Sequence, residues 1–350
     1  MASSVAEVTA SPTKIREIWP GLCAALVVSI VALAGGWLEE RAVGRAVIEP
    51  LVLAILVGMV ARTILADWAT GEAGIRFASK YVLEVAVFLL GATMDVPRLF
   101  ASGPALALGI VVLVVAALAA GYAVGRAAGL SPNLAVLVAC GNAICGNSAI
   151  AAVAPVIGAS KNDVAASIAL TAVLGVAVVL GLPLLIAPLA LSHYQYGVLA
   201  GLTVYAVPQV LAAAFAVSAA SGQVATAVKL ARVLMLGPVV LFFAVRARRT
   251  GGAVRGGEAR LSFTKLVPWF VIGFTLLAVL RSSGAIGDGE ANAAKLIAGW
   301  LTILAMAGLG LSVDVRSVRA VGARVVVAVA GSLVVLIGLA VALIRLLAVL

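Results

Sequence analysis

The sequence predicts an all-α polytopic membrane protein with about eleven transmembrane helices. Of its 350 residues, 64% are hydrophobic and 11% are charged, whereas soluble domains average about half apolar and a quarter charged residues. Apolar runs recur from Trp19 to the C-terminus, many of them near the roughly 20 residues that a helix needs to cross about 30 Å of hydrocarbon. These runs are apolar on every side, whereas a membrane strand would alternate apolar and polar residues.

The predicted spans follow one another along a single transmembrane domain, residues 19–350, after a cytoplasmic N-terminal segment, residues 1–18. We expect them at 19–37, 48–65, 75–94, 103–124, 133–158, 163–187, 197–219, 223–245, 265–281, 293–312 and 320–346. The first run also resembles a signal peptide, because it ends on the small residues Ala32-Leu33-Ala34. In a chain with so many spans we favour a retained first helix.

Basic residues set the expected orientation in a bacterial cytoplasmic membrane. The formal charge is +10, and Lys and Arg gather at the ends of the apolar runs, most densely from Arg246 to Lys265. This distribution is typical of cytoplasmic loops and argues against nucleic-acid binding. An odd span count then places the N-terminus inside and the C-terminus outside. The Gly- and Arg-rich basic loop, residues 246–262, is the segment that resembles a flexible linker.

Weak similarities between segments of the sequence predict an inverted-repeat transporter fold. Gly91-Ala-Thr-Met-Asp95-Val ends the third span and Gly310-Leu-Ser-Val-Asp314-Val ends the tenth. These two spans point in opposite directions by count, as inversion requires. A second similarity relates the residues after Asn147 in span five to those after Pro208 in span seven. By count these spans run parallel, so the repeat pairing stays open.

Two spans are expected to break near the middle of the membrane. Span five contains Cys140-Gly-Asn142-Ala-Ile-Cys-Gly-Asn147-Ser148, and span seven contains Val207-Pro208-Gln209. Gly weakens a helix interior, Asn and Ser favour an N-cap, and Pro suits a first helical turn. Two half-helix N-termini would offer free N–H groups and positive dipole ends to an anion. The alternative is a pair of kinked helices packed through small residues.

Span eight carries Lys229 and Arg232, three residues apart and therefore on one helix face. Arg232 is about 13 Å from the start of the span at roughly 1.5 Å per residue, too deep to reach the surface easily. A charge at this depth costs at least roughly 3 kcal/mol unless it is paired or hydrated. We expect substrate contacts here. The alternative is a structural ion pair with Glu84, Asp95 or Asp314.

Those three carboxylates are candidates for ion coupling. Glu84 follows Lys80 by one turn, so an internal pair explains it equally well. Asp95 and Asp314 stand where spans end, so helix capping explains them. Cys140 and Cys145 have no His or carboxylate beside them, so we expect neither a metal site nor a cofactor.

These motifs together resemble the YeiH-type sulfate exporter family. The resemblance rests on Phe88-Leu-Leu-Gly-Ala-Thr-Met-Asp95, the Cys140 to Ser148 break, Ala206-Val-Pro-Gln209, and Lys229-Leu-Ala-Arg232. A wider similarity links the order of these motifs to the bile acid:sodium symporter-like fold. The resemblance implies a mobile core of crossed broken helices in a scaffold. It also implies substrate contacts from Asn142, Asn147, Ser148, Gln209, Lys229 and Arg232.

The expected function is therefore secondary export of a small anion, with sulfate or a related sulfur oxyanion or sulfonate as substrate, by a chain that is not an enzyme. No Gly-x-x-x-x-Gly-Lys-Ser/Thr loop for ATP occurs. An ion-coupled organic-anion symporter is the first alternative. A membrane-embedded enzyme or a non-transporting sensory protein is the second. The expected partners are the anion and the lipid bilayer, and a homodimer is left open.

Overall fold

The computed structural model describes residues 15–43, 49–64, 71–94, 103–249, 269–313 and 323–347, and no strand occurs among them. Six of the described helices are long and apolar enough to cross a membrane. They span Glu17–Arg41, Pro104–Ala127, Lys161–Leu185, Ala219–Ala247, Asp288–Ser312 and Ala323–Leu346. The predicted all-helical membrane class is therefore confirmed. The count of eleven spans and the inverted repeat stay predictions.

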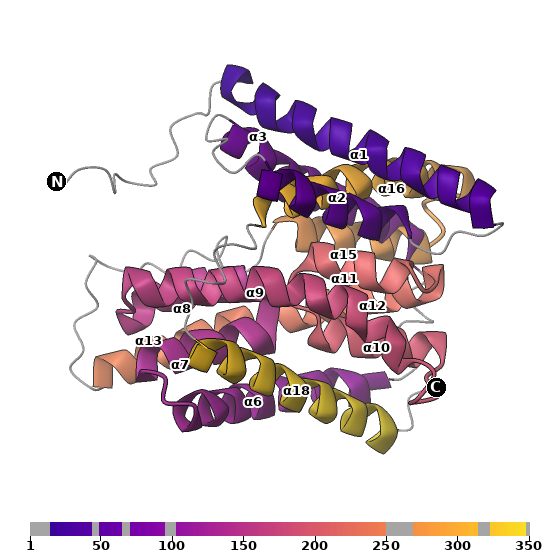
Figure 1. The fold of residues 1–350 in the computed structure, drawn as a ribbon. Coiled ribbons are helices and arrows are strands. Elements are labelled where there is room, and N and C mark those ends of the chain that lie inside the picture. The colour runs from indigo at the N-terminus through magenta and orange to yellow at the C-terminus, as the bar shows by residue number, and fades with distance from the viewer. Residues whose placement is uncertain are drawn as a thin grey trace.

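One set of helices, which we call the α16 group, gathers around helix α16. Its members are α1 (Ile15–Val43), α2 (Pro50–Ile64), α3 (Glu72–Arg76), the π-helical η2 (Phe77–Val82), α4 (Leu83–Leu90), the 3-10 helix η3 (Gly91–Thr93), α15 (Trp269–Ser282) and α16 (Asp288–Ser312). Helix α16 packs against α1, α2, η2 and α4, and α15 packs against α4 and η3. Helices α1, α2 and α16 lie together in Figure 1.

The remaining helices form a second set, which we call the α12 group. Its members are α6 (Gly103–Ala127), α7 (Pro132–Cys140), the π-helical η5 (Gly141–Cys145), α8 (Asn147–Ile157), α9 (Lys161–Gly181), the 3-10 helix η6 (Leu182–Leu185), α10 (His193–Thr203), α11 (Val207–Phe215), α12 (Ala219–Leu234), α13 (Leu236–Arg249) and α18 (Ala323–Leu346). Helix α10 packs on α12, and α6 packs on α7 and α18. Figure 1 shows α6 and α18 at the end of the molecule opposite α1.

Glycines bring the backbones of the α16 group into direct contact. A Cβ on Gly21 of α1 would stand 2.0 Å from the Gly71 carbonyl oxygen, and one on Gly74 of α3 would stand 2.0 Å from the Ile18 carbonyl oxygen. Helices α2 and α16 meet in the same way, because a Cβ on Gly310 would lie 2.3 Å from the Ile55 carbonyl oxygen. Small residues at helix interfaces are the usual means of packing helices in membranes. These contacts join α1 to α3 and α2 to α16.

The two groups meet chiefly where α11 of the α12 group contacts α16. Contacts of α2 with α9 and α11 add to this boundary. A hydrogen bond also crosses it, from Gln223 Nε2 of α12 to the Thr93 carbonyl oxygen of η3, at 3.0 Å. The boundary places the end of α16 beside the broken helices.

Candidate anion-binding site

The first predicted break is present, and Gly146 makes it. Helix α7 continues into the π-helix η5, which ends at Cys145, and α8 starts at Asn147. Gly146 adopts φ 66° and ψ −125°, a region that is essentially reserved for glycine. A Cβ here would also stand 3.3 Å from the Tyr205 Cβ. The backbone conformation therefore requires glycine, and the missing side chain also lets the second broken segment approach closely.

The second predicted break is also present, between α10 and α11. Val204 leaves the helix with extended dihedral angles, and α11 starts again at Val207 with Pro208 in its first turn. The Gln209 Oε1 accepts a hydrogen bond from the Ala206 backbone N–H at 3.2 Å. Gln209 therefore caps the N-terminus of α11, and the sequence interpretation of two interrupted helices is confirmed.

Lys229 and Arg232 join the two breaks through backbone carbonyl groups. The Lys229 Nζ donates to the Ile144 carbonyl oxygen at 2.6 Å and to the Val204 carbonyl oxygen at 2.9 Å. The Arg232 Nε donates to Ile144 O at 2.7 Å, and its Nη2 donates to Val204 O at 2.9 Å. Both side chains are 0% exposed. The two carbonyls end the first halves of the broken helices, where the helix dipole is negative, so the cations neutralise both ends at once.

Two buried polar atoms near this junction have no hydrogen-bond partner among the described residues. They are the Arg232 Nη1 and the Tyr205 hydroxyl oxygen. Tyr205 lies in the second break and is 1% exposed. An unsatisfied buried donor costs about 1–3 kcal/mol, so such groups call for an explanation such as a ligand.

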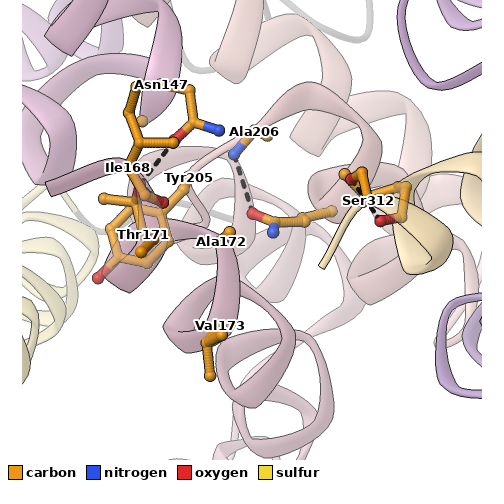
Figure 2. A pocket seen from close by; sticks show the side chains of 12 residues that line it. Asn147, Ile168, Thr171, Ala172, Val173, Tyr205, Ala206 and Ser312 are labelled. Atoms are coloured by element: carbon orange, nitrogen blue, oxygen red, sulfur yellow. Dashed lines mark hydrogen bonds between the residues drawn. The ribbon is translucent and has the colours of Figure 1, made fainter. Parts of the chain in front are cut away.

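A cavity of about 290 Å³ opens where the second halves of the broken helices start. It is lined by Gly146, Asn147, Ile168, Ala169, Thr171, Ala172, Val173, Tyr205, Ala206, Gln209, Leu309 and Ser312. The lining comes from both breaks, from the middle of α9 and from the end of α16. Figure 2 shows Asn147 and Tyr205 on one side of the cavity and Ser312 on the other. The cavity therefore lies on the boundary between the two helix groups.

Polar side chains in the cavity are held in place by their neighbours. The Thr171 Oγ1 lies 2.7 Å from the Asn147 Oδ1 (Figure 2). Because the Asn147 oxygen is occupied by this hydroxyl donor, its amide N–H₂ remains available as a donor. On α9, a Cβ on Gly175 would stand 2.2 Å from the Gln209 Nε2. The missing side chain at Gly175 therefore makes room for Gln209.

The six residues predicted to contact the substrate lie in different places in the structure. Asn147 and Gln209 line the cavity, and Ser148 is an exposed residue in the first turn of α8. Asn142 lies elsewhere, since its Nδ2 donates to the Val329 carbonyl oxygen of α18 at 3.2 Å and contacts the Ser332 hydroxyl. Lys229 and Arg232 bind carbonyl groups and do not line the cavity.

Sequence reasoning missed Thr171, Tyr205 and Ser312 as cavity residues. Ser167 and Thr171 do give a signal, because they place two hydroxyls one turn apart in an otherwise apolar span. Nothing in the sequence distinguishes Tyr205 or Ser312.

Of the three carboxylates predicted to couple ions, the structure describes Glu84. The Glu84 Oε2 accepts a hydrogen bond from the Trp269 Nε1 at 2.7 Å, while the Lys80 Nζ lies 5.2 Å from the centroid of the Tyr81 ring. The expected Lys80–Glu84 pair was therefore wrong, because a nearby indole on α15 satisfies the carboxylate. Asp95 and Asp314 lie outside the described residues, as do residues 250–262 of the basic loop.

Known proteins resemble this chain along most of its length. A family model described as Conserved hypothetical protein 698 matches residues 20–329. A UPF0324 membrane protein of Brucella suis is 48% identical over 337 residues, which cover 96% of this chain and 99% of that protein. A UPF0324 membrane protein of Bradyrhizobium diazoefficiens is 47% identical over 336 residues, covering 95% and 94%.

More distant organisms carry relatives as well. A UPF0324 membrane protein of Bacillus cereus is 33% identical over 300 residues, which cover 85% of this chain and 87% of that protein. No solved structure matches the chain. The names of these relatives describe a membrane protein and state no substrate. The chain belongs to the family described as Conserved hypothetical protein 698, together with its UPF0324 membrane protein relatives from Brucella and Bacillus.

Proposed function

We propose that this protein is a secondary transporter that exports a small anion across the bacterial cytoplasmic membrane. Sulfate, or a related sulfur oxyanion or sulfonate, is the proposed substrate. The observation that carries the proposal is the cavity at which the N-termini of α8 and α11 converge. The family resemblance seen in the sequence supports the sulfur oxyanion.

An anion suits this cavity because the N-termini of α8 and α11 meet at it. The first-turn N–H groups of α8 and α11 have no partner within their helices apart from those that caps satisfy. Each helix start carries roughly half a positive charge. Lys229 and Arg232 add two cations behind the breaks. No acidic side chain stands among the described residues that line the cavity.

The size of the cavity suits a small ligand. Sites for drug-sized molecules range from about 300 to 1,000 Å³, so a volume of about 290 Å³ lies below that range. The Asn147 amide remains available as a donor in the cavity, whereas the Thr171 hydroxyl donates to the Asn147 Oδ1 and the Ser312 hydroxyl donates to the Leu309 carbonyl oxygen. An amide donates hydrogen bonds to an oxyanion without requiring a metal ion.

The position of the cavity between two helix groups supports a transport function. Leu309 and Ser312 of the α16 group close one side, while the α12 group provides the rest. Movement of one group against the other would expose the same site to either face of the membrane, which is the basis of alternating access. The inside-negative potential would then drive an anion outward by about 2.3 kcal/mol per charge per 100 mV.

The test is efflux of radiolabelled sulfate from liposomes that contain the purified protein, with an imposed potential, compared with sulfite and a short sulfonate. Thr171→Val should weaken sulfate binding and efflux roughly tenfold, because it removes the hydroxyl that orients Asn147. Thr302→Val is the matched control. Thr302 is a buried threonine whose hydroxyl donates to the Ala298 carbonyl oxygen, and it lies away from the cavity.

Other outcomes would point to other functions. Sulfate binding without efflux would support a sensory protein. Uptake of a carboxylate that requires a sodium gradient would support the organic-anion symporter. Equal losses of sulfate binding and efflux in Thr171→Val and Thr302→Val would show that the cavity is not the binding site.

A further inference from the structure

A second cavity, which we call the α1–α16 groove, lies on the outside of the α16 group. Its volume is about 490 Å³, and it is lined by Leu33, Asn292, Lys295, Leu296, Gly299, Trp300 and Ile303. Helices α1 and α16 are both long and apolar enough to cross the membrane. A groove between two such helices runs along the lipid phase, so its occupant must be apolar over most of its length.

The groove has a polar end and an apolar end. Asn292 and Lys295 stand near the start of α16, and Leu296, Trp300 and Ile303 follow deeper along the same helix. Leu296 is 67% exposed and Trp300 is 63% exposed. Gly299 keeps the middle open, because nothing lies within 4 Å of a Cβ placed there. The α1–α16 groove thus runs along the helix with Lys295 at one end.

The polar end of the groove lies beside the end of α1, which carries Glu39, Glu40 and Arg41. Gly21, near the start of α1, touches α3, and Gly308, near the end of α16, touches η2, which directly follows α3. The two helices are therefore antiparallel, and the end of α1 lies beside the start of α16. There the Arg41 guanidinium lies 4.0 Å from the centroid of the Trp37 ring.

Aromatic and basic residues together are typical of the membrane–water interface. Lys295 is exposed and forms no ion pair within the described residues. Two acidic residues, Asp288 and Glu290, stand in the first turn of α16; Asp288 is paired with Arg281, and neither lines the groove. Among the described residues that line the groove, Lys295 is the charged one.

We propose that the α1–α16 groove binds one anionic phospholipid, with its phosphate at Lys295 and Asn292 and an acyl chain along Leu296, Gly299 and Trp300. The ammonium and the amide both donate to phosphate oxygens. The open surface at Gly299 accepts the chain. This site is separate from the anion cavity and does not depend on which substrate is transported.

The experiment is native mass spectrometry and thermal unfolding of the full chain in detergent, with added phosphatidylglycerol or phosphatidylcholine of the same acyl chains. We expect a retained phosphatidylglycerol that raises the melting temperature more than phosphatidylcholine does. Lys295→Gln should reduce the preference for phosphatidylglycerol about fivefold, since one Lys at an anionic membrane surface contributes about 1 kcal/mol. Lys161→Gln, which removes an exposed Lys from the start of α9, should leave the preference unchanged.

A second pair of variants tests the groove by placing a large side chain in it. Gly299→Leu should abolish retention of both lipids, whereas Gly338→Leu should not. Gly338 is the matched control, because it is also an exposed glycine inside a long helix with nothing within 4 Å of its Cβ position. If Gly299→Leu fails to fold, Lys295→Gln decides alone, and an unchanged lipid preference overturns the proposal.

Three further results would overturn it. Stabilisation of the Gly299→Leu variant by inorganic phosphate alone, to the same extent, would show a simple anion site. A dimer in the mass spectrum that Gly299→Leu converts to a monomer would make the groove a contact between two copies. Equal lipid loss in Gly338→Leu would mean that the lipid is bound all around the protein.

Discussion

Lys229 and Arg232 show how backbone carbonyls accommodate buried cations, since no carboxylate among the described residues pairs with them. Each side chain donates to the carbonyls of Ile144 and Val204. Those carbonyls have no partner within their own helices because the helices end there, and they carry the negative end of the helix dipole. The breaks therefore create the acceptors that the two cations need, and the cations stabilise the breaks in return.

This pairing predicts a stability loss in Arg232→Gln. The variant removes the charged donors from Arg232 to Ile144 O and Val204 O, and hydrogen bonds to charged groups contribute about 1.5–3 kcal/mol each. We expect a clearly lower melting temperature of the empty protein, together with weaker sulfate binding, because the cation behind the cavity is lost. Thermal unfolding with and without sulfate measures both. Arg232→Lys should restore part of the stability but not the planar fork that reaches both carbonyls.

The control for this prediction is Arg126→Gln. The Arg126 Nη1 also donates to a backbone carbonyl, that of Leu130 between α6 and α7 at 2.5 Å, but Arg126 is an exposed residue. Its removal should lower the melting temperature much less, since water replaces the lost donor. An Arg232→Gln protein with an unchanged melting temperature and no sulfate binding would instead make Arg232 a direct substrate ligand.

At the scale of elements, helix α10 fixes the depth of the two cations by packing closely on α12. A Cβ on Gly197 would stand 2.8 Å from the Ser221 carbonyl oxygen, and one on Gly201 would stand 2.7 Å from the Ala225 carbonyl oxygen. Val228, which would lie 2.7 Å from the same Gly201 Cβ, directly precedes Lys229. The glycine face of α10 therefore sets where α12 presents its positive charges.

Gly201→Ala should consequently destabilise the protein by about 1–3 kcal/mol, the usual cost of overpacking a tight core. Chemical or thermal unfolding measures the loss, and sulfate affinity should fall with it because α12 moves outward. Gly338→Ala is the control, since its Cβ meets nothing within 4 Å. There the higher helix propensity of Ala should stabilise the protein by up to about 1 kcal/mol. Similar changes in the two variants would mean that α10 and α12 do not constrain each other.

At the scale of the whole molecule, two internally well-packed helix groups share a boundary that contains the cavity at the broken helices. Backbone contacts at Gly21, Gly74 and Gly310 join the α16 group internally. The α12 group is joined through the glycine face of α10 and through the cations at the two breaks. Interfaces with discrete packed arrangements are where proteins switch between states. The boundary is therefore the place at which transport movements are expected.

The orientation of the molecule supplies a separate prediction. An odd number of spans with the basic loop 246–262 in the cytoplasm places the N-terminus inside and the C-terminus outside. Alkaline phosphatase and green fluorescent protein fusions at each end measure this, because the first is active only outside and the second only inside. Two cytoplasmic ends would rule out eleven spans, and with them the opposite directions of spans three and ten.

The sequence by itself determined the membrane class, the helical structure and the two breaks. These follow from local chemistry: hydrocarbon forces each backbone segment to satisfy its own hydrogen bonds, and Gly146 and Pro208 change the helix wherever they stand. It also identified Lys229 and Arg232 as unusual, because a charge in an apolar run is costly in any arrangement.

The tertiary structure alone decided what those residues touch. The bonds from Lys229 and Arg232 to Ile144 join residues 85 and 88 positions apart, and the Glu84–Trp269 bond joins residues 185 apart. The cavity likewise needs α9 and the end of α16 to approach the breaks. A backbone carbonyl is present at every residue, so no sequence pattern marks the two that become acceptors for the cations. Only the approach of the two breaks in the folded chain brings them within reach of the same two cations.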